Sequence, residues 1–177
     1  MLKKAFTSGI VIGLIISLIS VLLYFIDYTL LASMTMGLIM IVLMIALPII
    51  AAVRIKKEQE SFNLKEAFLT VFLICVGSIL VSTAVNYIMF GLYDPGFGER
   101  LAEAAVENQE AMMSRFGLSG EEMDKALEET YNRTKEQYEP GSMLLGVLIG
   151  SLISAVFSII VALIIRKKEQ TNNVLDA

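Results

Sequence analysis

The sequence has no histidine, and it has only one cysteine and three prolines among its 177 residues. Without histidine, serine–histidine and cysteine–histidine catalysis, imidazole metal ligation and a histidine-based pH switch are excluded. Cys75 lies within a hydrophobic run, and as the only cysteine it cannot form a disulfide within the chain. The sequence therefore offers few of the side chains on which enzyme chemistry is commonly built.

Apolar residues dominate instead, at 56% of the chain, and the mean hydropathy is +0.71. They are concentrated in four long runs, at about residues 5–26, 30–53, 66–90 and 142–165. A helix rises ~1.5 Å per residue, so runs of this length reach across a hydrocarbon layer of about 30 Å. We therefore predict a single all-α integral membrane domain, residues 1–177, with four transmembrane helices.

The start of the chain also fits a secretory signal peptide, because Lys3 and Lys4 precede an apolar run. That run is longer than the apolar part of a signal peptide, which has roughly 7–15 residues, and no small-residue cleavage site follows it. We interpret it as a retained first span, joined to the second by a very short turn at residues 27–29.

Small side chains recur at every fourth position of the last run. They are Ser142, Gly146, Gly150, Ser154, Ser158 and Ala162. Such a ladder lets two helix backbones approach closely in lipid, where packing holds helices together. Its neighbour is either the first span, which has Gly9 and Gly13 in a ladder of its own, or a second copy of the protein. The second alternative makes a homo-oligomer through Gly146, Gly150 and Ser154.

Polar and proline positions in the second and third runs are informative. Pro48 removes one backbone hydrogen bond near the basic end of the second run, and a kink there is either structural or the wall of a cavity. Asn63 followed by Glu66 indicates the start of the third helix, as a capping box. Asn86 is the only amide inside any run, and we expect it to hydrogen-bond a neighbouring helix rather than a substrate.

Residues 94–141 form a polar insert between the third and fourth runs. Asp94-Pro95-Gly96 breaks the chain at its start and Pro140-Gly141 at its end. The insert contains twelve acidic and five basic residues, which gives it a net charge of −7. Its composition therefore differs sharply from that of the runs on either side.

The insert divides into two segments, residues 99–116 and 121–138, that both show the amphipathic period of a helix. The four residues between them are short enough for a tight turn, and Ser119 with Glu122 fits a second capping box. We therefore predict an antiparallel helical hairpin. Helices that lie flat on lipid usually carry Lys and Arg toward the headgroups, so the acidic composition argues against that alternative.

Basic residues gather on one side of the predicted bundle. They are Lys3, Lys4, Arg54, Lys56, Lys57, Lys65, Arg166, Lys167 and Lys168. The turn at residues 27–29, on the other side, has no basic residue. By the positive-inside rule, both termini are cytoplasmic and the acidic hairpin is extracytoplasmic. The tail after Lys168 is expected to be disordered.

Together these stretches resemble an uncharacterised family of bacterial four-span membrane proteins, a domain of unknown function typical of one Gram-negative phylum. The resembling stretches are Lys4-Ala5-Phe6 leading into Gly9 and Gly13, residues 61–68 at the start of the third helix, Tyr93-Asp94-Pro95, the acidic insert and the basic stop at Arg166. The resemblance covers nearly the whole chain. It implies four spans in the bacterial cytoplasmic (inner) membrane, and it brings no catalytic or binding residue.

The residues give no support to an enzyme. Hydrolysis within a bilayer needs an activated serine, paired aspartates or a ligated metal, and the runs contain serines without a visible base. Glu103, Glu107 and Glu110 share a helix face, but they lack the alternating ligands and glycine turn of a calcium loop, so a solvated face is favoured. We predict no catalytic, cofactor-binding or metal-binding residue and no nucleic-acid partner.

Two noncatalytic classes remain. A small oligomeric transporter or channel subunit would place ionisable groups inside the bundle, and the runs offer only Pro48 and Asn86 as hints of a pathway. The favoured class is a scaffold, assembly component or envelope sensor. In that case the acidic hairpin binds a protein partner while the four helices contact the lipid bilayer.

Overall fold

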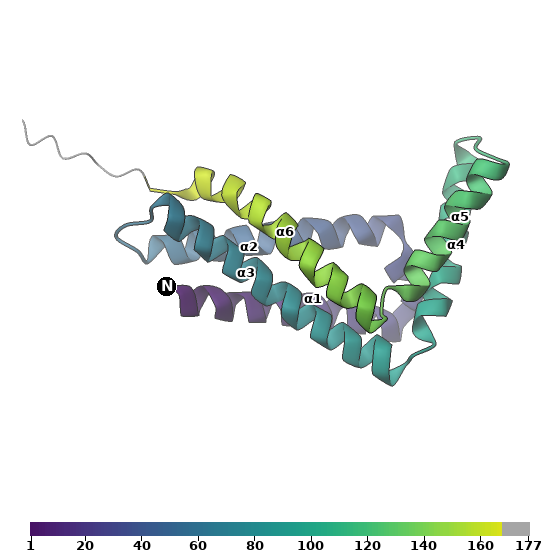
Figure 1. Cartoon of the computed structure of the whole chain (residues 1–177), viewed down its shortest axis with the longest axis horizontal. Coiled ribbons are helices and arrows are strands. Elements are labelled where there is room, and N and C mark those ends of the chain that lie inside the picture. The colour runs from purple at the N-terminus through teal and green to yellow at the C-terminus, as the bar shows by residue number, and fades with distance from the viewer. Residues whose placement is uncertain (168–177) are drawn as a thin grey trace, which may run out of the picture.

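The computed structural model describes residues 1–167, and this part of the chain is helical almost throughout. Its elements are α1 (Leu2–Asp27), the 3₁₀-helix η1 (Tyr28–Ala32), α2 (Met34–Lys57), α3 (Leu64–Asn86), the π-helix η2 (Tyr87–Tyr93), α4 (Phe97–Arg115), α5 (Glu121–Glu136) and α6 (Pro140–Ile165). Four helices run along the long axis of the molecule, and α4 and α5 project across that axis at the end opposite the N-terminus (Figure 1). The tail predicted to be disordered lies outside the described residues.

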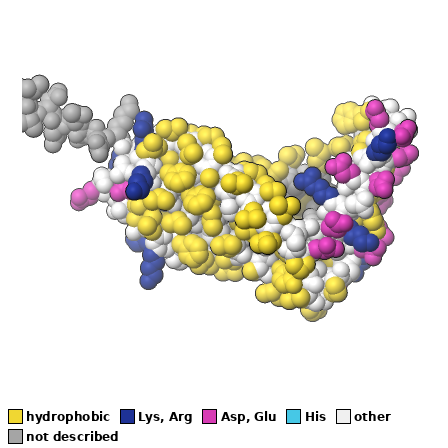
Figure 2. All heavy atoms as spheres, in the orientation of Figure 1, with side chains coloured by type: hydrophobic (Ala, Val, Ile, Leu, Met, Phe, Trp, Pro, Cys, Tyr) yellow, Lys and Arg dark blue, Asp and Glu magenta, His cyan; other side chains and the backbone are white. Residues whose placement is uncertain are grey.

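Four helical segments are long and apolar enough to cross a membrane: Leu2–Ala32, Met34–Lys57, Leu64–Tyr93 and Pro140–Ile165. Their outward faces carry large apolar side chains that no other part of residues 1–167 covers, such as Leu152, which is 70% exposed. These side chains form the apolar surface of the bundle (Figure 2). Exposed apolar surface of this extent is stable in lipid rather than in water. The chain is a multi-pass membrane protein, and the prediction of four spans is confirmed.

The third span lies at the centre of the bundle, because both α1 and α6 pack mainly against α3. Where α1 meets α3, a Cβ atom added to Gly9 would lie 2.5 Å from the carbonyl oxygen of Ile74 and 3.1 Å from Gly77 Cα. One added to Gly13 would lie 2.7 Å from the carbonyl oxygen of Ser78. The two backbones are therefore in direct contact, and only glycine fits between them.

Only part of the small-residue ladder of α6 is buried against other helices within residues 1–167. Ser154, Ser158 and Ala162 are buried, whereas Gly146 is exposed and a Cβ atom added there would meet nothing within 4 Å. A four-residue ladder drifts about 40° per step around a helix of ~3.6 residues per turn, so it follows one neighbour over only part of its length. Of the two candidate neighbours, the first span is wrong, because α6 packs chiefly on α3; a second copy of the protein stays a prediction.

The capping box at the start of α3 is confirmed. Asn63 Oδ1 accepts a hydrogen bond from the Glu66 amide at 2.9 Å, and a Glu66 carboxylate oxygen accepts one from the Asn63 amide at 2.9 Å. The second capping box is wrong, because the residue before α5 is Gly120, which has φ 89° and no side chain to cap the helix. The chain thus enters α5 one residue later than a Ser119 cap requires.

The ends of the spans nearest to α4 and α5 also differ from the prediction. The first connection is longer than a three-residue turn, since η1 extends to Ala32 and α2 begins only after Ser33, whose hydroxyl accepts from the Met36 amide at 3.2 Å. The third span does not stay α-helical to residue 90, because η2 continues it to Tyr93 as a π-helix. Such wide turns inside a helix frequently mark functional sites.

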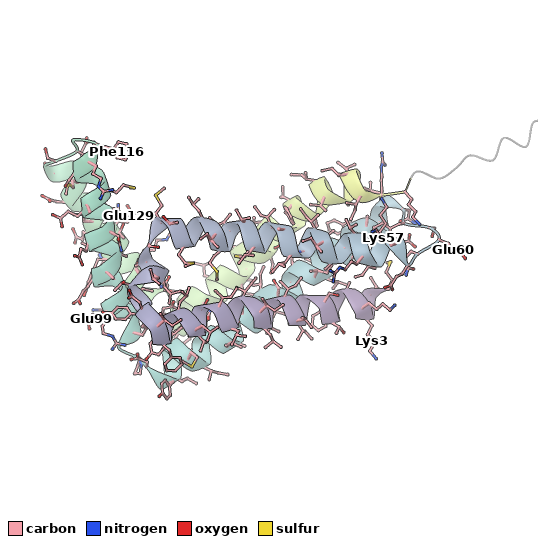
Figure 3. All side chains as sticks on the ribbon, turned by 180° about the vertical axis from the view of Figure 1, so that it is seen from behind. Lys3, Lys57, Glu60, Glu99, Phe116 and Glu129 are labelled. Carbon is pink, nitrogen blue, oxygen red and sulfur yellow. The ribbon has the colours of Figure 1, made fainter. Side chains whose placement is uncertain are left out.

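Contacts between separate segments close the basic end of the bundle. Lys4 forms an ion pair of 2.6 Å with Glu58, which joins the start of α1 to the end of α2. The backbone amide of Lys167 donates to the carbonyl oxygen of Phe62 at 2.8 Å, which joins the end of α6 to the loop before α3. Lys3, Lys57 and Glu60 lie at this end of the molecule and Glu99, Phe116 and Glu129 at the other (Figure 3).

Candidate functional site

The candidate functional site is the head, which we define as residues 94–139 and which contains α4 and α5. The two helices pack against each other, and a Cβ atom added to Gly98 would lie 2.5 Å from the carbonyl oxygen of Lys135. Further along the pair, Thr130 Oγ1 donates to Gln109 Oε1 at 2.5 Å. The two helices of the head therefore form one packed pair rather than two independent helices.

An aromatic cluster fixes the base of the head to the bundle. Phe90, Phe97 and Leu101 are its buried centre, and Tyr24 and Tyr138 pack against them. The rings of Phe90 and Phe97 are stacked with centroids 4.4 Å apart, and the Tyr24 ring meets Phe97 edge-on at 5.2 Å. The cluster joins α1, η2 and α4 to Tyr138, which lies two residues after the end of α5. Aromatic pairs of this kind add about 0.5–1.5 kcal/mol each beyond their buried area.

The π-helix explains why Phe90 reaches this cluster. The amide of Asp94 donates to the carbonyl oxygen of Met89 at 3.1 Å, five residues back, which closes the wide turn. Phe90 is 1% exposed, whereas its neighbours Leu92 and Tyr93 face outward. The wider turn thus directs one aromatic side chain into the base of the head.

Asp94 is the polar centre of the same junction. Its Oδ2 accepts a hydrogen bond from the Tyr24 hydroxyl at 2.8 Å and forms an ion pair with Arg100. The Arg100 guanidinium in turn lies over the Tyr28 ring, 5.9 Å from its centroid. Burial alone would raise the pKa of Asp94, but the hydrogen bonds from Arg100 and Tyr24 outweigh it and hold the pKa below its ordinary value of 3.8.

The outer surface of the head carries many carboxylates. Only Glu99 and Glu121 are paired there, with Lys135 at 3.1 Å and Lys125 at 2.7 Å. The exposed acids of the head that form no ion pair within residues 1–167 are Glu103, Glu107, Glu110, Glu122, Asp124, Glu128, Glu129, Glu136 and Glu139. Figure 2 shows acidic side chains along the side of the head that faces away from the bundle.

Most of these carboxylates are exposed on α4 and α5. Among the described residues, no group of three or more Asp, Glu, Cys or His side chains is placed to hold a metal ion. Glu103, Glu107 and Glu110 are exposed on α4, as the interpretation of a solvated face requires. The arrangement suits long-range attraction of a positively charged surface instead.

The tip of the head is apolar. Phe116 is 78% exposed and Leu118 is 50% exposed, although Phe116 belongs to the first segment with the amphipathic period of a helix. The difference arises because α4 ends at Arg115 and the chain turns away at Gly117, which has φ 73°. Phe116 lies at the far end of the head (Figure 3). An exposed aromatic side chain surrounded by charge is typical of a binding surface.

Asn86 lies in a crevice of about 620 Å³ between α5 and the ends of α3 and α6. Its Oδ1 is buried and has no hydrogen-bond partner within the described part of the chain. The expectation that this oxygen bonds a neighbouring helix is therefore wrong. Arg133 lines the same crevice, and it forms no ion pair within residues 1–167.

Pro48 is buried and lines a different crevice of about 290 Å³ between α2, α3 and α6. This crevice and the one at Asn86 have no lining residue in common. The two positions that hinted at a pathway are thus not brought together in the described residues.

The sequence pattern did not reveal the junction of the head. Tyr24, Asp94 and Arg100 are separated by up to 76 positions and meet only because η2 turns the chain back toward α1. Only the pairing of Asp94 with Arg100 had a local signal in the sequence. The two residues are six positions apart, which is less than two turns of a helix.

A family model described as "Protein of unknown function (DUF4199)" matches residues 7–167. No curated protein and no solved structure matches the chain. The matched residues include the whole head, the second, third and fourth spans, and the first span from residue 7 onward.

Proposed function

The chain belongs to the DUF4199 family of proteins of unknown function, and we propose that it is a noncatalytic membrane protein that presents its acidic head to a protein partner. Such a protein acts as a scaffold, an assembly component or a sensor in the cell envelope. We further propose that it resides in the bacterial inner membrane with both termini in the cytoplasm. The basic residues at the end opposite the head support this orientation.

The single observation that supports the partner-binding role best is the surface of the head. Nine exposed carboxylates that form no ion pair within residues 1–167 are spread along the head, and its tip carries the exposed apolar side chains of Phe116 and Leu118. A surface of negative charge accelerates and orients the approach of a basic partner, and an exposed aromatic residue supplies local affinity. The chain also holds this surface in a fixed position through the aromatic cluster at its base. A simple connection between α3 and α6 requires none of these features.

Replacement of the head tests the proposal. The head, residues 94–139, is exchanged for a short Gly/Ser turn, and proteins that co-purify from the native membrane are compared with those of the wild type. We expect the partner to be lost although the protein still inserts. If the shortened protein keeps every co-purifying protein and the wild-type phenotype, the head has no recognition role.

A milder variant separates charge from folding. Glu103→Gln, Glu107→Gln and Glu110→Gln together remove three exposed charges from α4 without touching its contact with α5. We expect weaker and less salt-sensitive binding of the partner, because the loss affects long-range attraction. Glu60→Gln, at the opposite end of the molecule, is the control and should leave binding unchanged.

A small oligomeric transporter or channel subunit is the alternative. The unpaired Oδ1 of Asn86 in its crevice favours it, since buried polar groups inside a membrane are commonly functional. Oligomers would form through Gly146, whose side of α6 is open, together with Gly150 and Ser154, which lie at the edge of the contact between α6 and α3. Gly146→Leu should then dissociate the oligomer, and Asn86→Leu should abolish solute flux in liposomes. Unchanged flux in Asn86→Leu would count against this alternative.

A further inference from the structure

A groove runs between α1 and α2 at the basic end of the bundle, far from the head. Its volume is about 780 Å³, and it is lined by one side of α1 between Lys3 and Ile15 and by one side of α2 between Leu47 and Ile55, with Glu58 just after α2. It exists because Gly9 and Gly13 draw α1 against α3, and α1 packs much more extensively on α3 than on α2. The sides of α1 and α2 that face each other therefore leave space between them.

The mouth of the groove is positively charged. Lys3, Lys4 and Arg54 line it together with one acid, Glu58. The Glu58 carboxylate is paired with Lys4 at 2.6 Å. Lys3 and Arg54 have no carboxylate within 4.0 Å among residues 1–167, so they remain available to an anion.

Deeper in the groove the lining changes in a regular order. Thr7 and Ser8 follow the basic residues about one turn along α1, and they bring hydroxyl groups that can donate hydrogen bonds. Beyond them the walls are apolar, with Val11 and Ile15 on α1 and Leu47 on α2. An anionic lipid presents complementary groups in the same order, which are its phosphate, its ester groups and its acyl chains.

We propose that this groove binds one anionic glycerophospholipid from the membrane leaflet on the basic side of the protein. The phosphate lies between Lys3 and Arg54, the ester groups face the hydroxyls of Thr7 and Ser8, and an acyl chain fills the apolar part between α1 and α2. Basic pockets between helices on the cytoplasmic side of membranes bind such headgroups. A free phosphate ion would leave the apolar walls unfilled, which is why the occupant is a lipid.

The test measures lipid binding to the purified full-length protein in detergent micelles by native mass spectrometry. The probes are dioleoyl phosphatidylglycerol, which is anionic, and dioleoyl phosphatidylcholine, which is zwitterionic. Each basic residue near a lipid surface contributes roughly a fivefold factor, so Lys3→Gln with Arg54→Gln should weaken phosphatidylglycerol binding about 25-fold. Phosphatidylcholine binding should hardly change.

The matched control is Lys57→Gln with Lys65→Gln, which removes the same charge at the same end but outside the groove. It should keep the wild-type affinity within about twofold, since its bases do not face the groove. Equal losses in both double variants would overturn the proposal, because only general surface charge would then be at work.

A second arm distinguishes a lipid from a free phosphate ion. Ala51 lines the apolar part of the groove, so Ala51→Phe should block the acyl chain and reduce lipid binding although all the bases remain. Inorganic phosphate at millimolar concentration should not displace the lipid. Displacement by phosphate, or full lipid affinity in a folded Ala51→Phe protein, would overturn the proposal. If Ala51→Phe does not fold, the charge variants and the phosphate competition still decide.

Discussion

Gly9→Ala should destabilise the bundle although alanine is the better helix former. The added Cβ atom would lie 2.5 Å from the carbonyl oxygen of Ile74 and 3.1 Å from Gly77 Cα, where α1 and α3 touch. The obstacles are backbone atoms, which cannot rotate away as a side chain would. Overpacking of this kind costs about 1–3 kcal/mol, against a gain of about 1 kcal/mol in helix propensity. Because the obstacle at 2.5 Å is rigid backbone, the cost lies in the upper part of that range, at about 2–3 kcal/mol, and a net loss of about 1–2 kcal/mol is expected.

The same substitution at Gly37 is the matched control, because a Cβ atom there would meet nothing within 4 Å. Gly37→Ala should therefore keep or raise the stability by up to about 1 kcal/mol. Thermal unfolding in detergent checks both variants, and a loss of about 1–2 kcal/mol corresponds to a fall in Tm of roughly 2–8 °C for a chain of this size. Equal melting temperatures for Gly9→Ala and Gly37→Ala would refute the close contact between α1 and α3.

Other predictions concern α6 and the base of the head. Gly150→Leu should lower the melting temperature, because the Cβ atom alone would lie 3.4 Å from Ile79 Cδ1 and the rest of the leucine side chain has to fit beyond it. Leu148→Ile, at an exposed position, should not lower it. Equal melting temperatures of the two variants would contradict this packing. The lowered pKa of Asp94 means that its stabilising effect is complete above its ordinary value of 3.8 and is lost as the pH falls below it. Proteolysis should therefore release the head more readily near pH 3 than at pH 7. In Asp94→Asn this difference should be smaller, with the remainder due to groups such as Glu99, whose pKa is also lowered by its pairing with Lys135. An undiminished pH dependence in Asp94→Asn would show that Asp94 is not responsible.

The spans could be predicted from the sequence because lipid allows few solutions. A backbone in hydrocarbon must satisfy its hydrogen bonds internally, so a long apolar run has to form a helix. The Asn63 cap was equally predictable, since its donors and acceptors lie within four residues. In both cases the determining interactions are local or imposed by the solvent.

The pairing of helices and the shape of the head were not predictable in the same way. Small residues at every fourth position show that a helix is closely packed, but the pattern does not name the neighbour. Gly9 and Gly13 turned out to face α3. The π-helix η2, which directs Phe90 toward Phe97, has no signal in the local sequence pattern. The cap assigned to Ser119 failed because Gly120 adopts a positive φ and starts α5 instead.

Labelling of single cysteines tests the central claim, that the acidic head and the basic end face opposite sides of the membrane. The buried native thiol, Cys75, is first replaced by alanine, and Ser119→Cys at the tip or Lys57→Cys at the basic end is then introduced. In intact cells a membrane-impermeant maleimide should label Ser119→Cys, and it should label Lys57→Cys only after the membrane is opened. Labelling of Lys57→Cys in intact cells with Ser119→Cys protected would contradict the account.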